Sequence, residues 1–105
     1  MKVTREQAQE IVVKEVTDYL DKYGASTGVP MHILMSRESR DHVISIGTSI
    51  MMNRLEFNTF PGSFVQAILD NSLSGAFAKA DSINQQCLRF YTTMMYSLGI
   101  DISPE

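Results

Sequence analysis

Residues 4–24 read TREQAQEIVVKEVTDYLDKYG, a pattern that predicts one long amphipathic helix. Thr4 and Gln7 have the spacing of a capping box, in which each side chain accepts a hydrogen bond from the other residue's backbone N–H. Apolar residues then recur every three or four positions, at Ala8, Val12, Val16, Leu20 and Tyr23. Gly24 is expected to end the helix. The face carrying the apolar residues needs a partner helix to cover it.

The next part of the chain predicts a loop and a second long helix. Residues 24–30 read GASTGVP, which is typical of a short connection. Residues 31–35 suit either a buried strand or a helical turn, and we expect the turn. Helical spacing then links Val43, Gly47, Ile50, Met51 and Leu55, so we predict a helix that runs to about Glu56. Residues 43–46 would also suit a strand, and Gly47 weakens either structure.

Residues 57–62, FNTFPG, interrupt this pattern, and shorter helices are expected after them. Ser63 and Gln66 have the spacing of a second capping box, for a helix that carries Phe64, Val65, Ile68 and Leu69. A short helix is expected from about Leu73 to Ala80. Asp81 would cap a last helix ending at Gly99, and its apolar face would bury Cys87. Residues 100–105 are expected to form a loose tail.

These patterns predict a single all-α domain over residues 1–105, a small bundle of about four to five helices. A chain of 105 residues with 44% apolar and 20% charged residues supports one hydrophobic core. No apolar run is long enough to span a bilayer, and the polar opening KVTRE lacks the core of a signal peptide, so a cytoplasmic location is expected. The net charge of −3 argues against a protein that coats nucleic acid.

The sequence contains no recognisable catalytic motif, so we expect a protein without enzymatic activity or cofactor. No Gly-x-Ser-x-Gly elbow and no phosphate-binding Gly-rich loop is present. His32 and His42 lie ten residues apart with no carboxylate or cysteine at ligand spacing, which gives a metal site little support. Cys87 is the single cysteine, and alone it forms neither an internal disulfide nor a thiolate cage.

The best candidate site for a ligand is the expected helix start at Gly62 and Ser63. Free amides at a helix start bind anions, and the predicted site combines them with neighbouring polar side chains. The candidate ligand-binding residues are Arg54, Gly62, Ser63, Lys79, Asn84 and Arg89. The simpler alternative is that Ser63 only caps its own helix and Asn84 belongs to a cap.

A second charged segment, residues 36–42, reads SRESRDH. Alternating charges of this kind are typical of a solvated helix face with pairs inside the helix. The alternative is a polar surface for a ligand or partner, on which Arg37 and Arg40 would contact phosphate or carboxylate groups.

Residues 61–64, 67–73 and 76–84 read PGSF, AILDNSL and AFAKADSIN. Together they resemble a family of small tailed-phage and prophage proteins that carry a Pro-Gly-Ser-Phe-Leu, Asn-Asp-Leu, Ala-Asp-x-x-Asn pattern. The resemblance covers about residues 50–98. Val65 stands where that family has Leu, and Ser72 stands where it has the second acid, which puts any role of that acid in doubt. The resemblance implies a phage accessory protein in a bacterial cytoplasm, and it brings no activity with it.

Other small helical phage proteins counter bacterial immunity, and by that analogy we expect a non-enzymatic counter-defence protein. Its expected ligand is a small anionic nucleotide signal of the cyclic-nucleotide or ADP-ribose type. The alternatives are an inhibitor that binds a host defence protein directly, and a phage structural or regulatory interaction module. A homo-oligomer is expected because the short chain has several apolar helix faces and a limited interior, and because the methionine pairs Met51–Met52 and Met94–Met95 do not fit on single helix faces.

Overall fold

The computed structural model describes residues 1–57 and 59–105, which form mainly helices. The helices are α1 (Arg5–Tyr23), α2 (Met31–Leu34), α3 (Arg37–Arg54), α4 (Ser63–Leu69), α5 (Leu73–Lys79), α6 (Ser82–Gln86) and α7 (Leu88–Ser97), and the strands are β1 (Lys2–Val3) and β2 (Ser103–Pro104). The all-helical prediction is confirmed, and the described residues add one small pair of strands to it. They also form seven helical segments, more than the four to five expected, because several of them are very short.

Helix α1 begins and ends where the sequence predicts. The Gln7 N–H donates to Thr4 Oγ1 at 3.2 Å, and the Thr4 N–H donates to Gln7 Oε1 at 2.9 Å, so the capping box is confirmed. Gly24 is the C-terminal cap residue. The apolar stripe on the inner face, Ala8, Val12, Val16 and Leu20, is buried. This stripe packs along α3, so the longest helix provides one wall of the core.

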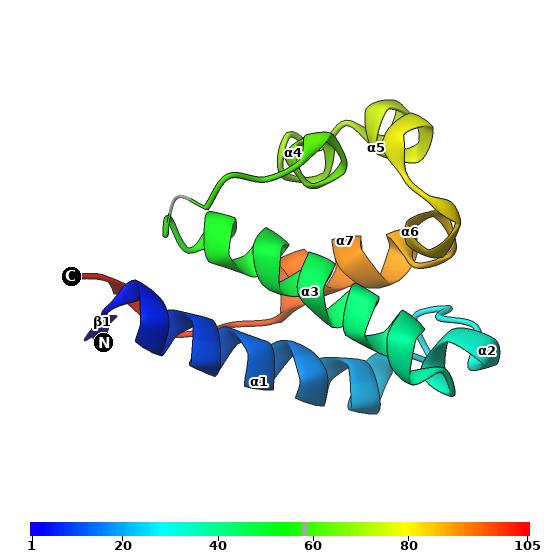
Figure 1. The fold of residues 1–105 in the computed structure, drawn as a ribbon. Helices are drawn as coiled ribbons and strands as arrows, with labels where there is room; N and C mark the ends of the chain where they lie inside the picture. Colours follow the sequence, from blue (N-terminus) through cyan, green and yellow to red (C-terminus); the bar gives the residue numbers. More distant parts are fainter. Residues whose placement is uncertain (58) are drawn as a thin grey trace.

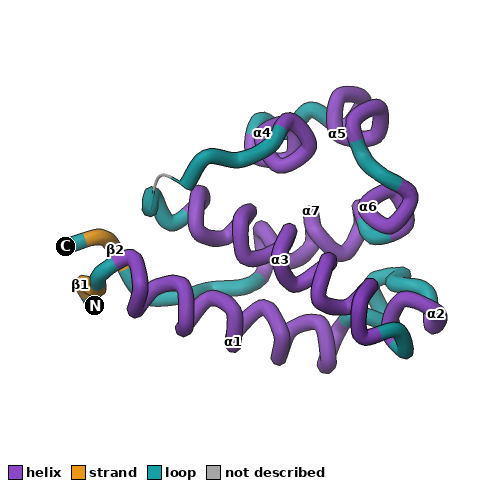
Figure 2. The backbone as a smooth tube through the Cα atoms, viewed as in Figure 1, coloured by secondary structure: helices purple, strands orange, loops and turns teal. Residues whose placement is uncertain are grey.

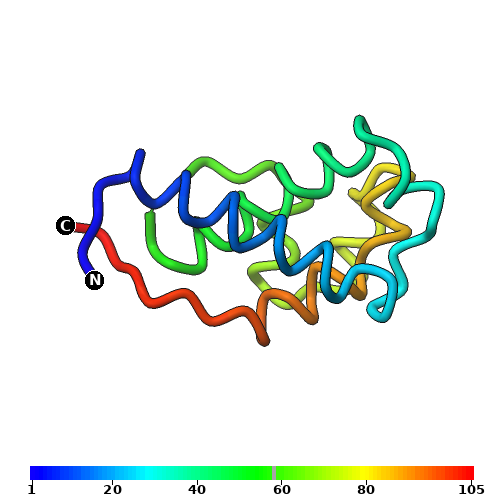
Figure 3. The backbone as a smooth tube through the Cα atoms, turned by 90° about the horizontal axis from the view of Figure 1, so that it is seen from below, coloured from blue at the N-terminus to red at the C-terminus, as the bar shows by residue number. Residues whose placement is uncertain are grey.

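Helix α3 lies at the centre of the molecule. Helices α1 and α3 run side by side in opposite directions, with the short α2 at their junction (Figure 1). Helices α4 and α7 also contact α3, and α5 follows α4 at one edge (Figure 2). Because other helices contact α3 on several sides, residues on more than one face of α3 are buried. The segment after α7 then returns along α1 to the first residues of the chain (Figure 3).

Side chains of α1 and α7 both contact α3 at Gly47. A Cβ atom placed on Gly47 would lie 2.9 Å from Val16 Cγ1 of α1 and 3.4 Å from Met94 Cε of α7. A contact of 2.9 Å to a β-branched side chain leaves no room for a methyl group, because Val16 has little rotamer freedom in a helix. The glycine that weakens the helical pattern in the sequence therefore permits the close packing of α1 on α3, while Met94 of α7 lies at an ordinary contact distance.

The helical turn predicted at residues 31–35 and the long helix predicted to run to about Glu56 are confirmed as α2 and α3, and three other predictions are wrong in detail. Gly62 precedes α4 in an extended conformation, and Ser63 is the first helical residue with no capping hydrogen bond, so the second capping box does not form. The last helix is broken at Cys87 into α6 and α7. The expected loose tail pairs through β2 with β1 in parallel, with Ser103 opposite Lys2, and Ile102 is buried.

The argument from paired methionines is also wrong. Met51, Met52, Met94 and Met95 are all buried within one chain. Adjacent positions on α3 can both be buried because helices cover α3 on more than one side. Exposed large apolar side chains occur elsewhere, among them Phe60, Leu73, Phe77 and Tyr96. Any contact between copies of the chain therefore has to use exposed apolar residues such as these and not the paired methionines.

The first prediction concerns the Gly47 contact. Gly47→Ala should lower the free energy of unfolding by about 0–2 kcal/mol, because overpacking costs about 1–3 kcal/mol and the gain in helix propensity returns about 1 kcal/mol. Urea unfolding followed by circular dichroism measures the change. In a Val16→Ala background, which removes the closest contact, the same substitution should be neutral or stabilising. A Gly47→Ala variant more stable than the parent would contradict the close approach.

Candidate functional site

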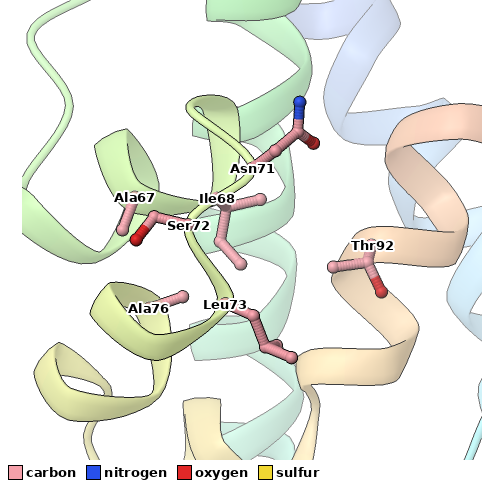
Figure 4. A pocket seen from close by; sticks show the side chains of 7 residues that line it. All are labelled: Ala67, Ile68, Asn71, Ser72, Leu73, Ala76 and Thr92. Carbon is pink, nitrogen blue, oxygen red and sulfur yellow. The ribbon is translucent and has the colours of Figure 1, made fainter.

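The candidate site is a small apolar hollow between the α4–α5 turn and α7 (Figure 4). Its volume is about 100 Å³, and its lining residues are Ala67, Ile68, Asn71, Ser72, Leu73, Ala76 and Thr92. Leu73 points toward α7 across the hollow, and Thr92 faces it from α7 (Figure 4). The hollow is too small to enclose a drug-sized ligand, so a ligand would use it as an anchor for one apolar group and extend over the surrounding surface.

Asn71 shapes the α4–α5 turn. Its φ is 59°, in the left-handed region that Asn adopts more readily than most residues. The Ser72 N–H donates to the Ala67 carbonyl at 2.9 Å and the Asn71 N–H donates to the Ile68 carbonyl at 3.1 Å, which are the two bonds of a Schellman motif. This turn reverses the chain into α5 and leaves the Asn71 side chain at the rim of the hollow. There its Oδ1 accepts a hydrogen bond from the Tyr96 hydroxyl.

Tyr96 connects this rim to Arg54. The Arg54 guanidinium carbon lies 5.2 Å from the centroid of the Tyr96 ring, within cation–π range. Tyr96 is 63% exposed and Arg54 is also exposed, so both groups are open to solvent. Within the described residues no carboxylate forms an ion pair with Arg54. The Tyr96 ring therefore holds a guanidinium whose hydrogen-bond donors remain available to an anion.

Arg89 lies on the same face of α7 as Thr92 and Tyr96, because the three positions are separated by three and four residues. It is exposed, like Arg54. The rise of 1.5 Å per residue places Arg89 about 10 Å from Tyr96 along the helix axis. Two of the predicted residues, Arg54 and Arg89, therefore border the same surface from different ends, with the Thr92 side of the hollow between them.

The structure does not bring the other predicted cation or the helix start to this surface. Gly62 and Ser63 lie at the opposite end of α4 from Asn71, and α4 has only seven residues. Lys79 is the last residue of α5, three positions after Ala76, and it does not line the hollow. The expected convergence of six residues on one helix start is thus replaced by two arginines, Arg54 at the end of α3 and Arg89 near the start of α7.

Asn84 forms structural contacts inside the fold. It is buried, and its Oδ1 accepts a hydrogen bond of 2.7 Å from the Tyr91 hydroxyl. Burial raises the pKa of Tyr91, which keeps this hydroxyl a donor. The Asn84 N–H donates to Asp81 Oδ1 at 2.7 Å, and the other Asp81 oxygen lies 3.0 Å from His42 Nε2. These contacts join the start of α6 to α7 and α3.

The charged segment of residues 36–42 forms the start of α3. Arg40 Nη2 donates to Asp21 Oδ1 of α1 at 2.6 Å, so its carboxylate partner belongs to the same chain. Arg37 is exposed. In the part of the chain that the structure describes, no three His, Cys, Asp or Glu side chains gather in a way that would hold a metal ion. No helix there is both long and apolar enough to cross a membrane.

Sequence reasoning missed Tyr96 and the role of Asn71. Tyr96 falls outside the apolar face predicted for the last helix, and its contact with Arg54 joins positions 42 residues apart. A signal for Asn71 was present, because Asn immediately after a helix favours the left-handed conformation. The bond between Asn71 and Tyr96 depends on how α4 and α7 are placed, and no local pattern carries that information.

The chain was compared with known protein families, with curated proteins and with solved structures, and none of the three comparisons gave a match.

The second prediction concerns Cys87 at the break between α6 and α7. The thiol is buried, and burial raises its pKa to about 11. At pH 8 only about one thiol in a thousand is then ionised, so a thiol reagent should label the native protein slowly and should react faster as the pH rises. Unfolding in urea should make labelling rapid. Fast labelling of the native protein at pH 8 would show that this face is misplaced.

The same shift predicts how stability depends on pH. The folded state favours the neutral thiol, so the contribution of Cys87 is fully present below the ordinary thiol pKa of 9.0 and is lost as the pH rises toward about 11. A Cys87→Ala variant should lack this dependence and serves as the control.

Proposed function

We propose that this chain is a non-enzymatic binding protein that captures a small anionic nucleotide on the surface formed by Arg54, Tyr96, Asn71 and Arg89. The observation that carries the proposal is the Arg54 guanidinium, which stacks on an exposed tyrosine and has no carboxylate partner among the described residues. An anchored guanidinium of this kind suits phosphate, which it contacts through two parallel hydrogen bonds.

The neighbouring groups suit the rest of a nucleotide. The hollow beside Asn71 is mostly apolar and offers one contact for a planar base or ribose. Asn71 provides amide donors at its rim, since its Oδ1 already accepts from Tyr96. Arg89, on the same face of α7, would contact a second phosphate. Cyclic dinucleotides carry two separated phosphates and cyclic trinucleotides carry three, whereas the two phosphates of ADP-ribose are joined directly to each other.

The biological setting belongs to the same proposal. The segment of residues 50–98 resembles a phage protein family, so we propose a phage accessory protein that removes a nucleotide immune signal in the bacterial cytoplasm. The polar residues of that segment support the fold in this chain. Asn71 forms the α4–α5 turn, Asp81 caps α6, and Asn84 pairs with Tyr91. The resemblance to the phage family therefore concerns residues that support the fold of this segment. The proposal of nucleotide binding rests on Arg54 and its neighbours.

Direct inhibition of a host defence protein is the second candidate, and the exposed apolar side chains favour it. Leu73 and Phe77 lie four residues apart on one face of α5 and are 69% and 55% exposed. Apolar residues that gather at the surface mark protein contacts more often than scattered ones do. The same face offers a contact between two copies of the chain, which is the revised basis for the proposed homo-oligomer.

The third prediction tests the nucleotide surface. Arg54→Ala should weaken binding of the best ligand in a panel of cyclic dinucleotides, cyclic trinucleotides and ADP-ribose by about 1.5–3 kcal/mol, the scale of hydrogen bonds to charged groups. Calorimetry at low salt measures the affinity. The melting temperature should change little, because an exposed cation–π pair contributes about 0.5–1 kcal/mol. Arg37→Ala, an exposed arginine at the other end of α3, is the matched control and should bind like the parent.

Other outcomes separate the competing functions. If the panel gives no heat while a stoichiometric host protein is recovered from a lysate, direct inhibition replaces nucleotide capture. Co-purification with virions would favour the structural or regulatory module. Binding that survives in both Arg54→Ala and Arg89→Ala would place the nucleotide elsewhere on the chain.

The fourth prediction tests self-association. Light scattering at high micromolar concentration should show a dimer or larger species, and Phe77→Glu should shift it toward the monomer, because a carboxylate is costly to bury in an apolar contact. Lys79→Glu, which changes charge on another side of α5, should leave the species unchanged. A parent protein that is strictly monomeric at this concentration would reject the homo-oligomer.

A further inference from the structure

A second hollow, of about 210 Å³, lies on another face of the molecule, beside α1 and α3. Its α3 side consists of Ser45, Thr48, Ser49 and Met52, whose spacing of three and four residues places them on one face of the helix. Helical periodicity puts Arg54 on the opposite side of α3. The hollow is therefore separate from the surface proposed for nucleotide capture.

Three more residues complete the lining of this hollow. Gln9 contributes an exposed amide from α1, and Thr59 and Phe60 come from the segment after α3. Asn53 holds this segment against the helix, because its Nδ2 donates to the Ser49 carbonyl at 2.8 Å and also to Thr59 Oγ1. All seven lining residues are uncharged. The Phe60 side chain is fully exposed at the edge, although an aromatic ring of this size loses free energy in water.

Thr48 supports a ligand in this hollow independently of the shape of the hollow. It is 4% exposed, and among the described residues its Oγ1 is the one buried side-chain nitrogen or oxygen without a hydrogen-bond partner. Leaving a hydroxyl unsatisfied in this way is costly, and such groups are rare in folded proteins. A helical threonine occupies two χ1 rotamers, so rotation can turn the hydroxyl toward a partner placed in the hollow. Thr48 is thus a buried polar group that lacks a partner and lines a polar hollow.

We propose that this hollow binds the base of a neutral nucleoside. Gln9 has an amide that can pair with the edge of a base, as Gln does with adenine, and the hydroxyls of Thr48 and Ser49 provide further donors and acceptors. Phe60 provides a ring on which the base stacks, and Met52 provides an apolar, polarizable contact. The absence of charge among the seven lining residues matches a ligand without phosphate. The hollow, of about 210 Å³, suits a single base.

The test uses adenosine, guanosine, cytidine and uridine in NMR titrations of the whole chain. Adenosine should shift the backbone amide signals of Thr48, Gln9 and Thr59 at millimolar concentration or below. Thr48→Val, which keeps the shape and removes the hydroxyl, should weaken this binding by roughly tenfold, the effect of one lost hydrogen bond. It should also raise the melting temperature, because the unsatisfied hydroxyl is gone.

Matched variants separate binding from folding. Thr17→Val removes a hydroxyl that donates to the Val13 carbonyl at 2.7 Å outside the hollow, and it should leave adenosine binding unchanged. Phe60→Ala should weaken binding with no change in melting temperature, since the ring is fully exposed. Arg54→Ala should not affect adenosine, which keeps this test distinct from that of the nucleotide surface.

Three results would overturn the proposal. The first is that none of the four nucleosides shifts the signals of the lining residues at millimolar concentration. The second is that Thr48→Val or Phe60→Ala binds adenosine as well as the parent does. The third is that glucose binds at these residues at least as tightly as adenosine, which would make the hollow a sugar site.

Discussion

The closeness of three helices at Gly47 is the constraint on which the rest of the structure depends. A Cβ atom on Gly47 would lie 2.9 Å from Val16 of α1, which is too close, and 3.4 Å from Met94 of α7, which is an ordinary contact distance. Helix α7 packs on α3 beside this point, and its last turn brings Tyr96 beside Arg54. The stacked guanidinium therefore lies two helical turns along α3 from the Gly47 contact. A small change in that packing would move the arginine relative to Asn71 and the hollow.

Polar residues in this chain divide into two groups. Asp81, Asn84 and Tyr91 satisfy one another and hold α6 and α7 together. Buried networks of this kind specify one arrangement of the core because each unpaired member would be costly. The second group contains Arg54 and Thr48. Among the described residues, Arg54 forms no ion pair and the buried Thr48 Oγ1 has no hydrogen-bond partner. Unused polar groups are better markers of a binding surface than residue type alone.

The sequence predicts the long elements well because their signals are local. The capping box of Thr4 and Gln7 and the stripe of apolar residues on α1 identify that helix without any tertiary information. The break at Cys87 could not be predicted, because neither Gly nor Pro marks it and the Asn84–Tyr91 bond spans it. Of the residues in the proposed site, Arg54 and Arg89 were candidates from the sequence, whereas Tyr96 could not be predicted, because its contacts join distant segments.

The pairing of β1 with β2 has a topological consequence. It holds the first and last described segments side by side, and the Ser103 N–H donates to the Met1 carbonyl at 2.9 Å. Because the two strands are parallel, Met1 and Glu105 lie at opposite ends of the pair, and a linker that runs back along the strands would join them into a ring. Ring closure restricts the unfolded ensemble while the native contacts stay the same, so the cyclic protein would gain stability through entropy alone. Both ends also emerge on one side of the bundle, away from the α5 edge.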